Sequence, residues 1–300
     1  KFSKKINAEF GLRYEHYTYN LDSESGEDIA KAFKNPFPIV RVNYNIDSVH
    51  SLQLAFNRSI TRPPFFNLTS FLLILDSSLV VYANPRLRPA FTNTVKITYG
   101  HKSTILSLAY LRRTGQVYFY NTMNKPVHLQ TSVPMNLDLE NIIEANLSFP
   151  VSATKWWKMI WNLNGLYHAV KDESSRPAIF QKKIFTYSVQ VNNSLRLGNN
   201  WTVSADGRYQ SRFLVGDQEQ FLHPYINLGI RKEFTRGNTL GIVFEDVTNS
   251  SGKLKWEYHQ PELGIRTFGN INFSERQMRI TYTHLFGNKK LSGKRERNTG

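Results

Sequence analysis

Residues 58–99 read RSITRPPFFNLTSFLLILDSSLVVYANPRLRPAFTNTVKITY, and this stretch decides the fold. Apolar and polar residues alternate where it begins and again at residues 95–99. Such alternation indicates a β-strand with one apolar face. Two proline-containing breaks, at residues 62–64 and 84–89, flank an apolar run between these strands. Proline cannot donate to a β-ladder, so we expect both strands to end there and one long loop to join them.

The same two-residue period recurs along the chain. In the first strand Phe10 and Leu12 alternate with Gly11 and Arg13. The clearest pair covers residues 185–197 and 201–213 and is joined by a short turn. The pattern repeats to give about twelve strands and predicts an all-β protein.

The connections between these strands alternate in length, long then short, along the whole chain. In an antiparallel barrel that crosses a membrane, one rim carries short turns and the other long loops. We therefore predict an antiparallel transmembrane β-barrel. In bacterial outer membranes the short-turn rim faces the periplasm.

The two faces of the strands agree with this interpretation. Twelve or more strands enclose too wide a space for the apolar side chains to fill, so lipid outside and water inside would suit the two faces. Nine aromatic residues near strand ends could form girdles at the membrane interfaces or ordinary core packing: Tyr14, Tyr17, Tyr19, Trp156, Trp157, Trp201, Tyr209, Phe213 and Phe286.

Composition narrows the class further. The longest uninterrupted apolar run, residues 71–75, is far short of the roughly 20 residues of a spanning helix. The chain has no Cys, which leaves no disulfide frame or thiol chemistry. Its net charge is +15, but Lys and Arg are scattered except at residues 1–5 and 289–297. We therefore expect outer-membrane lipid as a partner and no nucleic acid.

Candidate ligand-binding residues are polar, lie on the face predicted to line the lumen, and approach the long-loop rim: Arg13, Glu15, Thr186, Ser188, Gln190, Arg208, Gln210 and Arg212. Arginine suits carboxylates, phosphates and anionic chelates. The alternative favoured at this stage is that these side chains hydrate a channel or pair with a plug.

Catalytic chemistry is not indicated by the sequence. It contains no G-x-S-x-G, H-E-x-x-H or P-loop motif. The eight His residues are dispersed without metal-ligand spacing. An outer-membrane phospholipase is the enzymatic rival, but no Ser stands out for that role. We expect no enzyme activity, no cofactor and no metal site.

Several motifs resemble a known family. Arg62-Pro63 at a strand end, followed by Asn84-Pro85-x-Leu87-x-Pro89, is similar to the C-terminal barrel region of TonB-dependent receptors, in particular the Bacteroidetes-type outer-membrane β-barrel family. Family members usually have Gly where Ala83 stands here. The stretch at residues 244–249 resembles the family's late Asp-x-x-Asn element, and residues 280–288 its last strand.

The resemblance implies a barrel of about 22 strands, plugged by an N-terminal domain. It also implies uptake of a scarce nutrient, of the siderophore, oligosaccharide or peptide class, into the periplasm. The implied partners are the TonB energy-transducing complex, through a plug domain that these residues do not contain, and a surface lipoprotein. The implied location is the bacterial outer membrane.

On this interpretation, residues 1–287 are the C-terminal portion of the barrel and residues 288–300 a basic periplasmic tail. A closed barrel of about twelve strands is the structural alternative. A structural or adhesive barrel without active transport is the functional alternative, and a soluble ligand-binding β-protein is a third. An upstream plug would favour the transporter, whereas a reading frame that starts near Lys1 would oppose it. We expect residues 65–83 to form an outer loop whose apolar run packs on the barrel or the plug.

Overall fold

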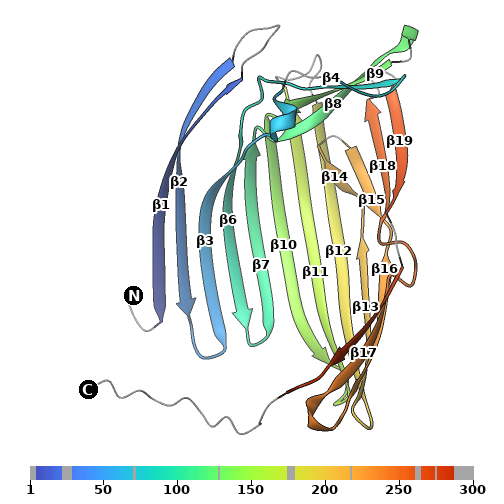
Figure 1. Cartoon of the computed structure of the whole chain (residues 1–300). Helices are drawn as coiled ribbons and strands as arrows, with labels where there is room; N and C mark the ends of the chain where they lie inside the picture. Colours follow the sequence, from blue (N-terminus) through green and yellow to red (C-terminus); the bar gives the residue numbers. More distant parts are fainter. Residues whose placement is uncertain are drawn as a thin grey trace.

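The computed structural model describes residues 5–21, 29–69, 72–127, 129–173, 180–216, 218–260, 265–273 and 276–286 (Figure 1). These residues form strands and three short 3₁₀ turns. Within them, no helix is long and apolar enough to cross a bilayer. The predicted basic tail at residues 288–300 lies outside the described residues.

Twelve strands make one continuous antiparallel sheet, as the alternation predicts. In spatial order these are β1 (Ile6–Leu21), β2 (Ile29–Asn45), β3 (His50–Thr61), β6 (Ala90–His101), β7 (Thr104–Thr114), β10 (Leu139–Ser152), β11 (Trp157–Asp172), β12 (Phe180–Leu197), β13 (Trp201–Gln210), β16 (Tyr225–Glu233), β17 (Thr239–Glu245) and β20 (Gln277–Thr283). Each strand pairs with its neighbours in that order. The sheet is curved like part of a barrel wall (Figure 1).

The alternation of connection lengths is confirmed. Short turns at residues 46–49, 102–103, 153–156, 198–200 and 234–238 all lie at one end of the sheet (Figure 1). The last of these turns contains the 3₁₀ turn η3 (Thr235–Gly237). Asn199 and Asn200 both have positive φ, which Asn tolerates and which matches the twist of a tight hairpin.

The long connections are not the plain loops that the sequence predicted. Those after β3 and β7 contribute β4 (Leu72–Asp76), β5 (Leu79–Tyr82), β8 (Val117–Asn124) and β9 (Leu129–Asn136), with η1 (Phe65–Asn67) and η2 (Lys125–Val127). These four strands form a second sheet, in which β5 pairs in parallel with β9 of the other loop. The third sheet contains β14 (Phe213–Val215), β15 (Gln218–Leu222), β18 (Lys253–Gln260) and β19 (Ile265–Asn272).

The apolar run of the opening stretch does not pack on the barrel among the described residues, and its packing on a plug stays a prediction. Leu72, Leu73 and Ile74 on β4 are 50 %, 42 % and 65 % exposed, rather than packed on the barrel. The reason is that β4 is an edge strand, bonded only to β5 within the second sheet.

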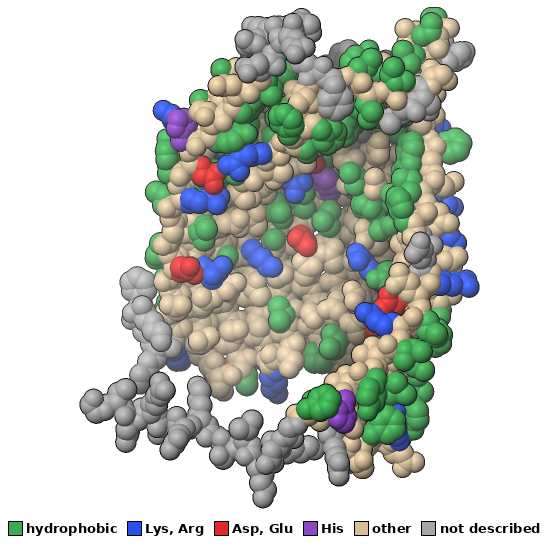
Figure 2. All heavy atoms as spheres, in the orientation of Figure 1, with side chains coloured by type: hydrophobic (Ala, Val, Ile, Leu, Met, Phe, Trp, Pro, Cys, Tyr) green, Lys and Arg blue, Asp and Glu red, His purple; other side chains and the backbone are tan. Residues whose placement is uncertain are grey.

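The outward face of the main sheet is apolar and exposed. Phe10 and Leu12 on β1 are 67 % and 74 % exposed, and Met278 and Ile280 on β20 are similar. An exposed apolar band of this kind is stable against lipid rather than water. The inward face carries charged and amide side chains, and Figure 2 looks onto this concave face, where both charge signs are interspersed.

The buried hydrophobic core is small and lies at the long-loop rim. It consists of Tyr118, Tyr120, Leu137, Val170 and Leu214, with Met135 and Ile184 packed against it. The cluster forms because β8 and β14 fold inward over the lumen side of β11 and β12. The long loops therefore narrow the lumen at that end.

The sheet is open in the part of the chain that the structure describes. β1 and β20 are its two edges, and no pairing joins them within the described ranges. A closed barrel of about twelve strands is therefore not what these residues form.

We predict that charge is tolerated on one face of β6 and not on the other. Ile97→Arg would place a guanidinium in lipid near the middle of the strand and destabilise the barrel by about 2–4 kcal/mol. The neighbouring Thr98→Arg, which points into the lumen, is the matched control and should cost much less. Urea unfolding in lipid vesicles, followed by gel mobility, measures both. Equal losses would contradict the assignment of faces.

Candidate binding site in the lumen

The inner wall of β7, β10, β11, β12 and β13 is built of polar side chains in cross-strand register. Asn146 lies opposite Asn164, Asn164 opposite Ser188, and Ser188 opposite Gln210. The two-residue period puts all four on the same face because each pair is directly opposite. An uncharged hydrogen-bonding row thus crosses the wall.

A cavity of about 520 Å³ opens on this row beneath the long loops. Its lining combines six planar polar side chains, two hydroxyls and four apolar groups: Arg113, Glu144, Asn164, His168, Arg208, Gln210, Thr186, Ser188, Ile142, Leu166, Phe213 and Leu214. Four of the eight predicted residues, Thr186, Ser188, Arg208 and Gln210, meet here. The volume falls in the usual range for small-molecule sites.

Hydrogen bonds hold several of these side chains in place. Glu144 Oε1 accepts from Asn146 Nδ2 at 2.9 Å and from Asn164 Nδ2 at 3.1 Å. Arg208 Nη2 donates to Gln210 Oε1 at 2.8 Å. Arg208 has no acidic partner among the described residues, so its remaining donors are available to a ligand.

A charged cluster that the sequence did not reveal reaches the cavity through Arg113 and His168, which line it. Arg113 Nη1 and Glu140 Oε2 are 2.9 Å apart, and Glu140 is only 2 % exposed. His168 Nε2 lies 3.3 Å from Glu140 Oε1 and is also buried. Burying a carboxylate is costly unless it is paired, and Arg113 supplies that pair. These three residues are far apart in the sequence, so no local motif marks them. The one signal was the alternation along β7, β10 and β11, which assigns each of them to the lumen face.

Two predicted residues of the same wall lie outside the cavity lining. The Gln190 side chain points towards Asn192, and its Nε2 donates a hydrogen bond to Asn192 Oδ1 at 3.3 Å. Arg212 was predicted to lie on the strand that contains Arg208, but β13 ends at Gln210. Its side chain is 68 % exposed and lies 3.7 Å from Glu219, while its carbonyl accepts a hydrogen bond from Thr186 Oγ1.

Arg13 and Glu15 are not brought to the cavity. They lie on β1 near Arg62, whose Nη2 is 2.6 Å from Glu15 Oε2, and Arg13 is 3.2 Å from Glu15 Oε1. Tyr17 lies on the same face, with the Arg62 guanidinium 4.8 Å from its ring centre. Tyr19 lies beside Tyr17, with ring centres 5.8 Å apart, and Phe213 lines the cavity. These three aromatic residues therefore face the lumen side and do not belong to a girdle on the lipid face.

The Asn-Pro motif forms a clasp between the loops, which we define as residues 84–89. Asn84 Nδ2 donates to the Pro134 carbonyl at 2.9 Å, and the Leu87 side chain is fully buried. The Arg88 N–H donates to Asn136 Oδ1 at 2.9 Å, and Asn136 Nδ2 donates back to the Arg88 carbonyl. The motif thus connects the loop after β3 to β9 of the next loop.

The clasp also holds the hairpin of β1 and β2. Pairing between β2 and β3 stops at Ile39 and Asn57, so the upper part of β2 has no ladder to β3. Lys31 Nζ donates to the carbonyls of Pro85 and Leu87, and Tyr19 Oη donates to Leu87. The clasp therefore replaces the missing ladder at this rim.

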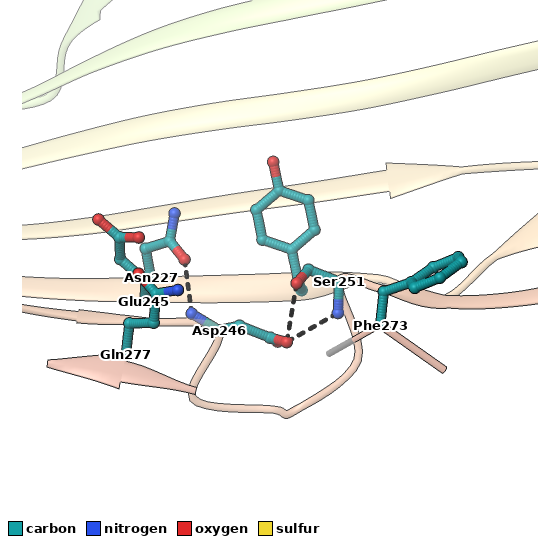
Figure 3. A pocket seen from close by; sticks show the side chains of 7 residues that line it. Asn227, Glu245, Asp246, Ser251, Phe273 and Gln277 are labelled. Atoms are coloured by element: carbon teal, nitrogen blue, oxygen red, sulfur yellow. Dashed lines mark hydrogen bonds between the residues drawn. The ribbon is translucent and has the colours of Figure 1, made fainter. Parts of the chain in front are cut away.

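A second motif, at Asp246, organises the turn after β17. Its carboxylate accepts from the N–H groups of Ser250 and Ser251 and from the hydroxyls of Thr248 and Ser251. Burial raises the pKa of Asp246, but these hydrogen bonds outweigh it and lower the pKa to about 2. Figure 3 shows Asp246 between Asn227 and Ser251 at the edge of a cavity of about 370 Å³.

Taken together, these groups can bind a polar ligand by hydrogen bonds and charge. Among the described residues, no group of three or more His, Asp or Glu is arranged to hold a metal ion. The sorted loops, apolar outer face and polar lumen define an outer-membrane β-barrel.

Comparison with known proteins agrees with this class. The chain belongs to the outer membrane protein beta-barrel family, whose model matches residues 1–284. This membership, together with the barrel fold, places it in the bacterial outer membrane. No curated protein matches the chain.

Three solved structures are similar in fold. The copper transporter OprC has a TM-score of 0.61 at 13 % identity, over 94 % of this chain and 45 % of that one. The siderophore receptor PirA from Pseudomonas aeruginosa has a TM-score of 0.52 at 9 % identity, over 84 % and 47 %. A mutant of the ferric enterobactin receptor PfeA from the same organism has a TM-score of 0.52 at 11 % identity, over 83 % and 38 %. The chain spans less than half the length of each.

We predict that the clasp stabilises the rim through Leu87. Leu87→Ala would leave a cavity at a fully buried position and cost about 2–5 kcal/mol locally. Hydrogen exchange at residues 84–89 and on β9 should speed up accordingly. Leu72→Ala, at a half-exposed position, is the control and should leave these rates unchanged.

The Asp246 turn should weaken in acid. Because the pKa of the folded state lies below the ordinary value of 3.8, the stabilisation is complete above pH 4 and disappears as the pH falls towards 2. The difference corresponds to about 2 kcal/mol. Urea unfolding at a series of pH values, compared between the wild type and Asp246→Asn, measures it. A constant difference between the two proteins from pH 5 to pH 2 would contradict the prediction.

Proposed function

We propose that this chain is the C-terminal part of the barrel wall of a TonB-dependent transporter that takes a scarce nutrient into the periplasm. The open sheet supports this, because both edge strands have unpaired backbone groups that a membrane does not tolerate. Further strands from the same protein would pair with β1 and β20 and close a barrel of about 22 strands. The chain covers 38–47 % of the length of the three similar proteins, which leaves room for further strands in each of them.

The observation that carries the proposal is the polar cavity at the outer rim of the lumen. It lies below the long loops, where a ligand arriving from outside would first meet fixed hydrogen-bonding groups. Arg208, Gln210 and Asn164 would contact the ligand, while the pair of Arg113 and Glu140 would fix the end of the cavity. The nutrient could be a siderophore, an oligosaccharide or a peptide, since all three offer oxygen acceptors.

Energy for the uptake would come from the TonB complex, acting through a plug domain encoded elsewhere in the protein. A surface lipoprotein would be a further partner at the long-loop rim. Such a transporter performs no covalent chemistry, so we expect neither enzyme activity nor a cofactor.

Uptake assays on the full-length protein in its native host test this function. Ferric siderophores, oligosaccharides and peptides would be offered as labelled probes, with and without a protonophore. We expect energy-dependent uptake of one class, reduced about tenfold or more by Arg208→Ala, because a charge-assisted hydrogen bond contributes roughly 1.5–3 kcal/mol. Lys96→Ala, which also faces the lumen but lies outside the cavity, is the control. Equal uptake with and without the energy source would reject the transporter.

The alternative of an adhesive or structural barrel has one observation in its favour. The apolar edge strand β4 is exposed above the membrane and could bind another surface. Loss of cell adhesion after replacing Leu73 by Lys, with uptake unchanged, would support that alternative.

A further inference from the structure

The short-turn rim carries a group of cations and aromatic rings around its outer side. We define this outer collar as Tyr99, His50, His101, Lys102, Lys155, Trp156, Trp157, Trp201 and Lys232. Its members come from the five short turns or from the strand ends beside them. Only the sheet brings them to one level, because they are spread over most of the chain.

The collar side chains on the strands lie on the lipid-facing side. His50 lies opposite His101, in the same register as the apolar pairs Leu52 with Tyr99 and Leu54 with Ile97. Trp201 lies opposite Leu197 and Lys232, and Trp157 opposite Leu195. The collar therefore directly continues the apolar band at its periplasmic end.

Within the collar, cations and rings are in contact. His50 Nδ1 is 2.6 Å from Tyr99 Oη, and the rings of His50 and His101 stack with centres 4.3 Å apart. Lys232 Nζ lies 5.0 Å from the centre of the Trp201 ring. The rings of Trp156 and Trp157 stack beside Lys155. Amphipathic rings of this kind settle at the level of the lipid headgroups.

The positive charge of the collar is not neutralised by the protein. Lys102, Lys155 and Lys232 form no ion pair among the described residues, and Lys232 Nζ donates a hydrogen bond to the Asn199 carbonyl. Two acids lie near the collar among the described residues. Asp47 accepts from the N–H groups of Val49 and His50 at 2.8 Å and so is engaged in its own turn. Glu233 follows Lys232 in sequence, and its carboxylate lies 3.9 Å from Arg231. On the lumen face, several cations do pair with acids, as Arg41 does with Glu9 at 3.0 Å.

We propose that the outer collar binds anionic phospholipids of the periplasmic leaflet through their phosphate groups. Three ammonium groups without an acidic partner at headgroup level, next to interfacial rings, match the charge and depth of a lipid phosphate. The inference uses the orientation of the barrel in the outer membrane, and it is independent of what the barrel transports. Lipid binding at the collar would fix the position of the barrel along the membrane normal.

The test uses the full-length protein in lipid nanodiscs that contain phosphatidylcholine, with or without phosphatidylglycerol. Native mass spectrometry counts the phosphatidylglycerol molecules retained, and a titration gives their affinity. For the wild type we expect selective retention of phosphatidylglycerol. Replacing Lys102, Lys155 and Lys232 together by Gln should weaken the affinity roughly a hundredfold at low salt, about fivefold per lysine.

The chain offers a matched control at the same rim. Three cations lie at the same height in the membrane as the collar lysines, but on strand positions that face the lumen: Lys158, Arg196 and Arg231. Lys158 lies opposite Ser194, and both Arg196 and Arg231 lie opposite Thr202 on the lumen face. Replacing these three by Gln should leave the affinity unchanged. An equal loss in both triple variants, or none in the collar variant, would overturn the proposal.

Folding is checked separately, in phosphatidylcholine alone, by the gel mobility of each variant. If the collar triple variant does not fold, the single changes Lys102→Gln and Lys155→Gln replace it, since both residues are exposed turn residues. Each should then weaken phosphatidylglycerol binding about fivefold. Unchanged affinity in both would equally reject the collar as a lipid site.

Discussion

A strand that crosses a bilayer has no water to bond its backbone, so it must pair with a neighbour along its whole span. β10 satisfies this on both sides, with β7 and with β11. Side chains are then free to differ between faces. Apolar groups such as Leu12 stay exposed to lipid, and no hydrophobic interior is needed in the wall. The buried cluster of Tyr118, Val170 and Leu214 accordingly appears only where the loops leave the membrane and fold inward.

Register determines which side chains the lumen receives. A slip of one residue in β1 would turn Arg13 and Glu15 into lipid and bring Phe10 and Leu12 into the lumen. The buried charge of Glu140 on the inner face is stabilised by Arg113 on the neighbouring strand. Such a pair also keeps the side chains at the cavity in fixed positions, because separating two buried, paired charges is costly.

The two rims have different chemistry because their connections differ in length. Long loops reach across to one another, and the clasp at residues 84–89 and the turn at Asp246 fix them over the wall. Recognition from outside can therefore use a preformed surface. Short turns leave only strand ends, whose exposed residues form the collar that we propose binds lipid headgroups. The proposed ligand site and the proposed lipid site therefore lie at opposite ends of the wall.

Alternation by itself determined the strands, their lumen and lipid faces, and the sorting of the loops. It also identified four residues of the cavity, because a fixed period of two assigns each strand residue to a face. Only the tertiary structure decided that β5 pairs with β9, that Arg113, Glu140 and His168 meet, and that β4 is exposed. These depend on which loops come close after the sheet has formed. A local pattern encodes the face of a residue, but not its distant partner.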